Sequence, residues 1–204
     1  MDDFDALLAL EAENFALLIG FLGTVVFLLS LWLTRIPIGS CLRVRVTWVC
    51  DGDTLIVRGW IRKFKVRLAG IDAPEGDQVF GEESRDLLRS LVGNRMVTIR
   101  IVDKDHWGRY VAFVQYAKRD VSLEMIRQGL AWGYKQYYRN LTPKQRWQFS
   151  SAERDARARK IGLWSLGDAK EPWKHRKENQ STKTWLHFLW LKIKNFLFGR
   201  KTYN

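Results

Sequence analysis

The chain contains no charged residue between Asn14 and Thr34, and this stretch limits its fold more than any other feature. Its core, Phe15 to Leu33, reads FALLIGFLGTVVFLLSLWL. A helix of ~20 apolar residues is long enough to cross the ~30 Å hydrocarbon core of a bilayer. We therefore predict a transmembrane helix over residues 14–34, preceded by an acidic N-terminal segment over residues 1–13. A buried core helix is the alternative, which the length and apolarity of the stretch disfavour.

A membrane anchor fits this stretch better than a cleaved signal peptide, because no basic residue precedes it and it exceeds the usual apolar region of such peptides. Arginines follow it, beginning at Arg35 and Arg43. The positive-inside rule then places the main domain in the cytoplasm. The sequence IGSC at Ile38–Cys41 resembles a bacterial lipobox, so lipidation of Cys41 is a minor alternative. The sequence leaves open whether Cys41 pairs with Cys50.

Charge is distributed unevenly along the chain. Lys and Arg number 34, Asp and Glu number 22, and the formal net charge is +12. Residues 1–34 hold five acids and no Lys or Arg, so the remainder carries +17. This surplus indicates an anionic partner, which is nucleic acid, an acidic membrane surface or both. With two Cys, three His and no CxxC or HExxH pattern, a zinc site is disfavoured.

Short segments beyond the apolar stretch alternate apolar and polar residues, which is typical of strands. We predict strands over residues 42–49, 54–58, 61–69, 97–102 and 109–116. Helical spacing occurs over 81–92 and 121–132, and again from an N-cap at Thr142 to about Lys160. Three strands, a helix and two more strands is the order of a five-stranded OB-type barrel. We therefore predict an α+β fold, an OB-type barrel with packed helices, over residues 42–176.

The C-terminal segment, residues 177–204, is basic and amphipathic. Between Trp185 and Phe198 the apolar residues gather on one arc at the helical period. Two lysines interrupt this run, so it is unsuited to spanning a bilayer. We predict an interfacial helix that lies on a membrane. A helix packed on the barrel or on a partner is the alternative.

Acidic and basic side chains gather where the predicted strands begin and end: Asp51, Asp53, Arg67, Asp72, Glu75 and Arg109. Because the second and third strands form a hairpin, Asp53 and Asp72 should meet at one end of the barrel. Two carboxylates there would repel each other without a cation between them. Hydrolysis of a phosphodiester needs such a cation, a base that positions water, and positive charge at the transition state.

Several motifs occur in a specific order over about two thirds of the chain. They are VCDGDT (Val49–Thr54), VRLAGIDAPE (Val66–Glu75), DKDHWGRYVA (Asp103–Ala112), IRQGLAW (Ile126–Trp132), GLW (Gly162–Trp164) and PWKHR (Pro172–Arg176). On these motifs the segment resembles the staphylococcal nuclease (thermonuclease) family. The resemblance implies a calcium-dependent endonuclease that hydrolyses phosphodiester bonds of DNA and RNA with low sequence specificity.

The resemblance also implies a metal-ligand set. Asp53 and Asp72 would ligate Ca²⁺ through their carboxylates, and Ala73 would do so through its backbone carbonyl. Asp51 would lie in the outer shell. Many family members have Thr where this chain has Ala73, and a carbonyl ligand tolerates that change.

Catalytic and binding roles follow from the same resemblance. Glu75 would be the general base, and Arg67 and Arg109 would clamp the phosphate and stabilise the transition state. The tyrosines that follow the IRQGLAW motif could stack on nucleobases: Tyr134, Tyr137 and Tyr138. Core packing is an equal interpretation for at least one of them.

A different class of function stays open at this point. OB-type barrels often bind nucleic acid without cutting it, so a membrane-tethered, non-catalytic binding module is the alternative. The side of the membrane is also open, because family members are commonly exported whereas the arginines after the apolar stretch favour the cytoplasm.

Overall fold

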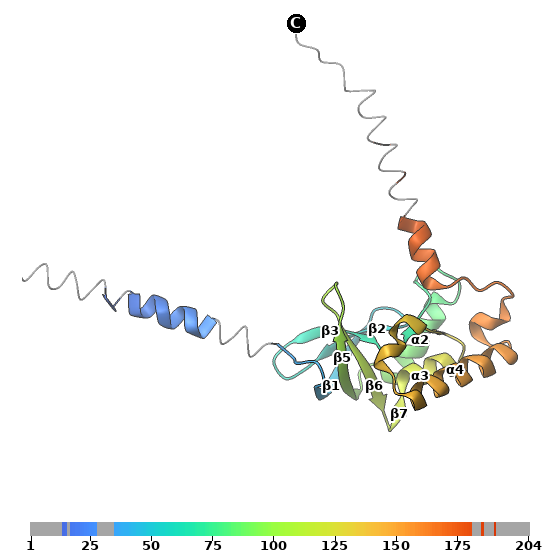
Figure 1. Ribbon diagram of the computed structural model, residues 1–204, viewed down its shortest axis with the longest axis horizontal. Coiled ribbons are helices and arrows are strands. Elements are labelled where there is room, and N and C mark those ends of the chain that lie inside the picture. The colour runs from blue at the N-terminus through green and yellow to red at the C-terminus, as the bar shows by residue number, and fades with distance from the viewer. Residues whose placement is uncertain (1–13, 16, 28–34, 181–184, 186–189, 191–204) are drawn as a thin grey trace, which may run out of the picture. The chain divides into compact units, whose positions relative to one another are not determined.

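The computed structural model describes residues 14–15, 17–27, 35–180, 185 and 190 (Figure 1). The chain divides into two compact units, Met1–Ser40 and Cys41–Asn204. In the first unit residues 17–27 are helical. Among the described residues, no helix combines the length and apolarity needed to cross a membrane. Parts of the predicted span, residues 16 and 28–34, and most of the predicted C-terminal helix lie outside the described residues, so both membrane assignments stay predictions.

The second unit is built on a closed barrel of five main strands, as predicted. These strands are β1 (Cys41–Val49), β2 (Thr54–Arg58), β3 (Lys63–Leu68), β5 (Met96–Lys104) and β6 (Tyr110–Tyr116). Neighbours pair in the order β3-β2-β1-β5-β6, and a parallel pairing of β3 with β6 closes the barrel. Alternation along the strands turns Val44, Val46 and Ile99 into the core, where each is at most 1% exposed.

Helices cover one side of the barrel, to the right in Figure 1. They are α2 (Gly81–Val92), α3 (Val121–Arg127) and α4 (Pro143–Ala158), with short 3₁₀ turns η1 (Lys135–Asn140) and η2 (Gly162–Ser165). Residues 172–180 form one more helical segment. The predicted N-cap of α4 is confirmed: the Thr142 hydroxyl accepts from the Gln145 N–H, and the Gln145 side chain accepts from the Thr142 N–H.

The prediction for α3 was wrong at its C-terminal end, because the helix ends at Arg127 rather than Trp132. Gly129 has a positive φ of 64° and packs against the Ile161 carbonyl, where an added Cβ would lie 2.3 Å from the oxygen. The chain therefore turns at Gly129. Trp132 then joins the two-residue strand β8 (Trp132–Gly133), which pairs with β4 (Ile71–Asp72) and fixes Asp72 in place.

Candidate active site

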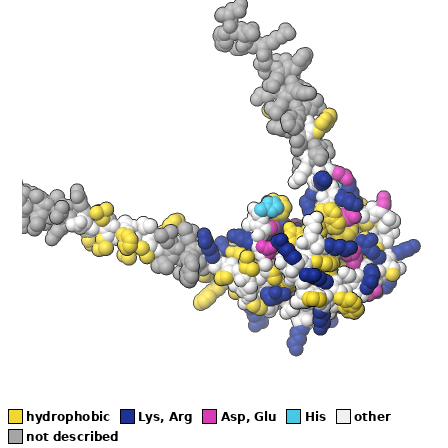
Figure 2. Space-filling model, in the orientation of Figure 1, with side chains coloured by type: hydrophobic (Ala, Val, Ile, Leu, Met, Phe, Trp, Pro, Cys, Tyr) yellow, Lys and Arg dark blue, Asp and Glu magenta, His cyan; other side chains and the backbone are white. Residues whose placement is uncertain are grey.

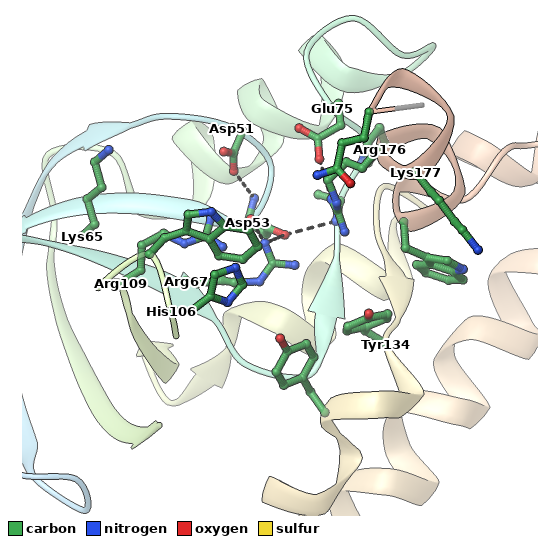
Figure 3. Close-up of a pocket in the computed structure, with 16 residues that line it drawn as sticks. Asp51, Asp53, Lys65, Arg67, Glu75, His106, Arg109, Tyr134, Arg176 and Lys177 are labelled. Atoms are coloured by element: carbon green, nitrogen blue, oxygen red, sulfur yellow. Dashed lines mark hydrogen bonds and ion pairs between the residues drawn. The ribbon is translucent and has the colours of Figure 1, made fainter. Parts of the chain in front are cut away.

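A cleft of about 630 Å³ opens at the end of the barrel where β2 begins and β3 ends. Strand ends, the β5–β6 loop, η1 and the helical segment 172–180 all contribute to its wall: Asp51, Asp53, Lys65, Arg67, Ala73, Pro74, Glu75, His106, Trp107, Arg109, Tyr134, Tyr137, Trp173, Arg176, Lys177 and Gln180 (Figure 3). Figure 2 shows further Lys and Arg side chains over the visible face of this unit. The cleft is thus predominantly charged, with an aromatic side.

Arg67 lies between the two aspartates that were predicted to converge. Its Nη1 is 2.9 Å from Oδ2 of Asp53, and its Nη2 is 2.5 Å from Oδ1 of Asp72. All three groups are buried, and Asp72 is 0% exposed. The pairing of Thr54 with Arg67 across β2 and β3 brings Asp53 to the level of the Arg67 side chain. The hairpin argument therefore placed Asp53 and Asp72 at the same end of the barrel correctly, whereas the position of Arg67 between them is a finding of the structure.

The DGDT sequence, Asp51–Thr54, forms the turn that positions Asp53. The Asp51 carboxylate accepts a hydrogen bond from the Asp53 N–H at 2.9 Å, which closes the turn. A Cβ at Gly52 would lie 2.0 Å from Oγ of Ser84 on α2, so only glycine fits there. The Thr54 hydroxyl donates to Oδ1 of Asp53 at 2.8 Å and orients that carboxylate.

Glu75 and Asp72 share a second arginine, Arg176, from the helical segment 172–180. Arg176 Nη1 is 2.5 Å from Oε1 of Glu75, and its Nη2 is 2.7 Å from Oδ2 of Asp72. Sequence reasoning noted the PWKHR motif but gave Arg176 no role in the site. Its only signal was that motif, because Arg176 lies 101 residues from Glu75 and no local pattern connects them.

Arg109 enters the cleft from the start of β6. Its Nε binds Oδ2 of Asp105 at 2.7 Å, and its Nη1 donates to the Thr54 hydroxyl at 3.2 Å. The Trp107 ring lies 5.1 Å from the Arg109 guanidinium carbon. Because β3 and β6 are neighbours, Arg109 and Arg67 reach the same cleft, as Figure 3 shows.

Two carboxyl groups of the site, those of Asp51 and Asp72, have raised pKa values. Burial, followed by the charge of Asp53, raises the pKa of Asp51 to about 7. Burial and Asp53 also raise the pKa of Asp72, against the lowering effect of Arg67 and Arg176. Burial alone would lower the pKa of Arg67, but Asp53 and Asp72 raise it above its usual value. A further cation near these carboxylates would be stabilised.

Carboxylate and carbonyl oxygens are the ligands that a hard divalent cation prefers. Asp53 and Asp72 lie on either side of the Arg67 guanidinium, and Ala73 follows Asp72 directly in the chain. In the described part of the chain, no three His, Cys, Asp or Glu side chains are grouped so that they could hold an ion. Two carboxylates would therefore need backbone carbonyls or water to complete the ligand set. The predicted ligand set, with the Ala73 carbonyl and Asp51 in the outer shell, stays a prediction.

Two of the three predicted base-stacking tyrosines line the cleft. The ring of Tyr134 is 5.0 Å from that of Tyr137 and 5.2 Å from that of Trp173, measured between centroids. Tyr138 is not among the residues that line the cleft. Its ring packs edge-on against Phe149 with its hydroxyl buried, which matches the core interpretation. Trp173 was missed, because its motif lies beyond the barrel in sequence.

Residues 65–166 match the family model described as "Staphylococcal nuclease homologue". The chain belongs to the staphylococcal nuclease family. A Haemophilus influenzae protein called "Uncharacterized endonuclease" is 37% identical over 76% of this chain and 86% of the relative. A Shigella flexneri protein called "Micrococcal nuclease" is 32% identical over 73% of this chain and 88% of the relative.

A rice relative, "Probable staphylococcal-like nuclease CAN2" from Oryza sativa subsp. japonica, is 34% identical over 66% of this chain. The match covers only 34% of that relative, so the two proteins share the staphylococcal nuclease domain rather than a whole architecture. Both bacterial relatives are covered nearly from end to end.

Proposed function

We propose that this staphylococcal nuclease family member is a calcium-dependent endonuclease that hydrolyses phosphodiester bonds of DNA and RNA with low sequence specificity. The observation that carries the proposal is the buried Asp53–Arg67–Asp72 cluster, with Glu75 and Arg109 on the same cleft. The names of the bacterial relatives, an endonuclease and a micrococcal nuclease, support it. A merely binding module would need nucleic-acid contacts but no buried acid–arginine cluster.

Each predicted metal-ligating or catalytic residue has a chemical task in this proposal. Asp53, Asp72 and the Ala73 carbonyl would hold Ca²⁺, with Asp51 in the outer shell, and the bound ion would polarise a phosphate oxygen. Glu75 lies at the rim with its side chain 35% exposed, where it can accept a proton from water.

The arginines supply positive charge where the phosphate gains negative charge. Arg109 and Arg67 both line the cleft, and the Arg67 guanidinium is paired with Asp53 and Asp72. Guanidinium groups form paired, charge-assisted hydrogen bonds with phosphate oxygens, which stabilises the transition state. Arg176 holds the Glu75 carboxylate and keeps it oriented before substrate arrives.

Chelation is the direct test of metal dependence. The purified protein is expected to cut plasmid DNA in Ca²⁺, to stop on addition of a chelator, and to resume when Ca²⁺ is returned. Thermal unfolding provides a readout without substrate: Ca²⁺ should raise Tm, because an ion that binds only the folded protein stabilises it. Cleavage that persists in the chelator would contradict the metal-dependent mechanism. DNA binding without turnover in any divalent cation would favour the non-catalytic module.

The aromatic side of the cleft predicts a binding defect. Tyr137→Ala is expected to weaken binding of single-stranded DNA by about 1–3 kcal/mol, because one base loses its stacking partner. Fluorescence anisotropy in the presence of a chelator measures binding without cleavage. Trp147→Ala is the matched control, since Trp147 is an aromatic residue on α4 that is 66% exposed and does not line the cleft. Equal affinities of the two variants for single-stranded DNA would show that Tyr137 does not contribute to binding.

We propose further that residues 14–34 anchor the protein in a membrane as a single span and that residues 177–204 lie on its surface. The uncharged stretch and the amphipathic pattern support this. Protease accessibility of the nuclease domain in intact cells or organelles determines its side. Protection from external protease means the cytoplasmic side that the arginines favour, and digestion means export.

A further inference from the structure

We propose that the tip of the β2–β3 hairpin, residues 59–62, is a membrane-contact loop that inserts Trp60 and Ile61 into the interface of an anionic bilayer. This surface is separate from the cleft, and the inference goes beyond the nuclease activity proposed above. It also does not require that activity.

Two large apolar side chains at the tip of the hairpin are exposed to solvent. The Gly59 N–H donates to the Arg62 carbonyl at 3.0 Å, so Trp60 and Ile61 are the residues at which the chain reverses. Trp60 is 102% exposed and Ile61 is 73% exposed, so neither packs against the barrel. Exposed apolar groups that gather at one point mark interaction sites, and Trp is favoured at membrane–water interfaces.

A row of cations lies directly behind the tip. Arg58 pairs with Lys63 across β2 and β3, and Arg45 pairs with Arg58 across β1 and β2. All three are exposed, and in the described part of the chain no acid forms an ion pair with Arg58 or Lys63. Like charges placed opposite each other weaken a sheet, so the fold gains nothing from this row. An anionic lipid surface would offset its charge.

The position of the tip suits a bilayer contact. Thr54 and Arg67 pair at the cleft end of the hairpin, and Arg58 and Lys63 pair four residues away, ~13 Å along the strand. β1 runs from the tip end, at Arg45, to the cleft end, at Val49, so the chain enters the barrel at the tip end. A bilayer at the tip would leave the cleft open.

Lipid fits this surface better than nucleic acid does. Ile61 has no π face on which a base could stack. Both an indole and an aliphatic side chain partition favourably into the region of lipid headgroups and upper acyl chains. The stacking rings of the domain lie instead at the cleft: Tyr134, Tyr137 and Trp173. An anionic phospholipid bilayer is therefore the proposed partner.

Site-specific lipid quenching tests the inference on the full chain. Cys41 and Cys50 are free thiols, so both are first replaced by serine. A single cysteine is then introduced by Ile61→Cys or by Val79→Cys and labelled with an environment-sensitive dye. Val79 is the matched control, since it is an aliphatic residue 67% exposed in the loop after Glu75. The protein is reconstituted into phosphatidylcholine vesicles with or without phosphatidylglycerol, both carrying a nitroxide lipid.

We expect the dye at position 61 to be quenched several-fold more than the dye at position 79 in the anionic vesicles. The difference should disappear without phosphatidylglycerol and in an Arg58→Glu/Lys63→Glu background. Thermal unfolding of each variant shows that the fold is intact, independently of nuclease activity. Equal quenching at the two positions would overturn the proposal. So would a dye at position 61 that responds to duplex DNA and not to lipid.

Discussion

Glu75→Gln is expected to lower the rate of DNA cleavage by about 10²–10⁴-fold at saturating Ca²⁺, the usual contribution of a general base. Glutamine cannot accept a proton from water, but its amide oxygen can still accept the hydrogen bond that Arg176 now gives to Oε1 of Glu75. The variant should therefore fold normally and bind DNA at least as well as the parent. Single-turnover cleavage of a labelled duplex measures the chemical step directly.

The control for this variant is Glu82→Gln, which removes an acid of the same kind from the first turn of α2. The Glu82 side chain is 76% exposed and does not line the cleft. The Glu82→Gln variant should therefore cleave DNA at the same rate as the parent protein. A Glu75→Gln protein that cleaves at the parental rate would refute the assignment of Glu75 as the base. Loss of Ca²⁺ binding in that variant would instead make Glu75 a metal ligand.

Arg67→Ala is expected to lower the free energy of unfolding by about 3–5 kcal/mol in the metal-free protein. The substitution leaves Asp53 and Asp72 buried without the guanidinium that lies 2.9 Å and 2.5 Å from them. Urea unfolding of the purified protein in a chelator measures the change. Added Ca²⁺ should restore part of the lost stability, because an ion between the carboxylates would supply positive charge.

The stability deficit of Arg67→Ala should depend on pH. The folded-state pKa of Asp72 is already raised above 3.8 by burial and Asp53, and loss of Arg67 raises it further. The unfolded chain then releases this proton more readily than the folded protein. The deficit is therefore largest above the folded-state pKa and shrinks as the pH falls towards 3.8.

The control for the stability effect is Arg89→Ala. Arg89 pairs with Asp86 on the surface of α2, with side chains 48% and 59% exposed, and such pairs contribute about 0–1 kcal/mol. If Arg67→Ala were no less stable than Arg89→Ala, the buried cluster would not depend on Arg67 for its charge balance.

The barrel could be predicted from the sequence because its strands follow simple alternation and its turns carry Gly and Asp. The helix α2 was predicted with its observed bounds, Gly81–Val92. The two-residue strands β4 and β8 were not predicted, because so short a pairing has no periodicity. The end of α3 was missed for a similar reason, since the close approach of Gly129 to Ile161 is a tertiary contact.

The candidate site likewise contains residues that local sequence patterns could place and residues that only tertiary contacts bring to the cleft. Asp53 and Asp72 were brought together by reasoning about a single hairpin, in which neighbours in space are near in sequence. Trp173 and Arg176 come from a helical segment that follows all the strands, and no local pattern indicated that it returns to the cleft. Tyr138 carries the same side chain as Tyr134 and Tyr137, and only packing against Phe149 distinguishes it.

The contribution of Arg176 has a consequence for biosynthesis. Arg176, whose guanidinium binds the Glu75 carboxylate, emerges from the ribosome about a hundred amino acids after Glu75 itself, since 101 positions separate the two partners. A nascent chain that has completed its barrel but not residues 172–180 lacks the ion pair that holds the Glu75 carboxylate. The ion pair between Arg176 and Glu75 can therefore form only once the domain is almost fully synthesised, and a chain that ends before residue 172 would lack it.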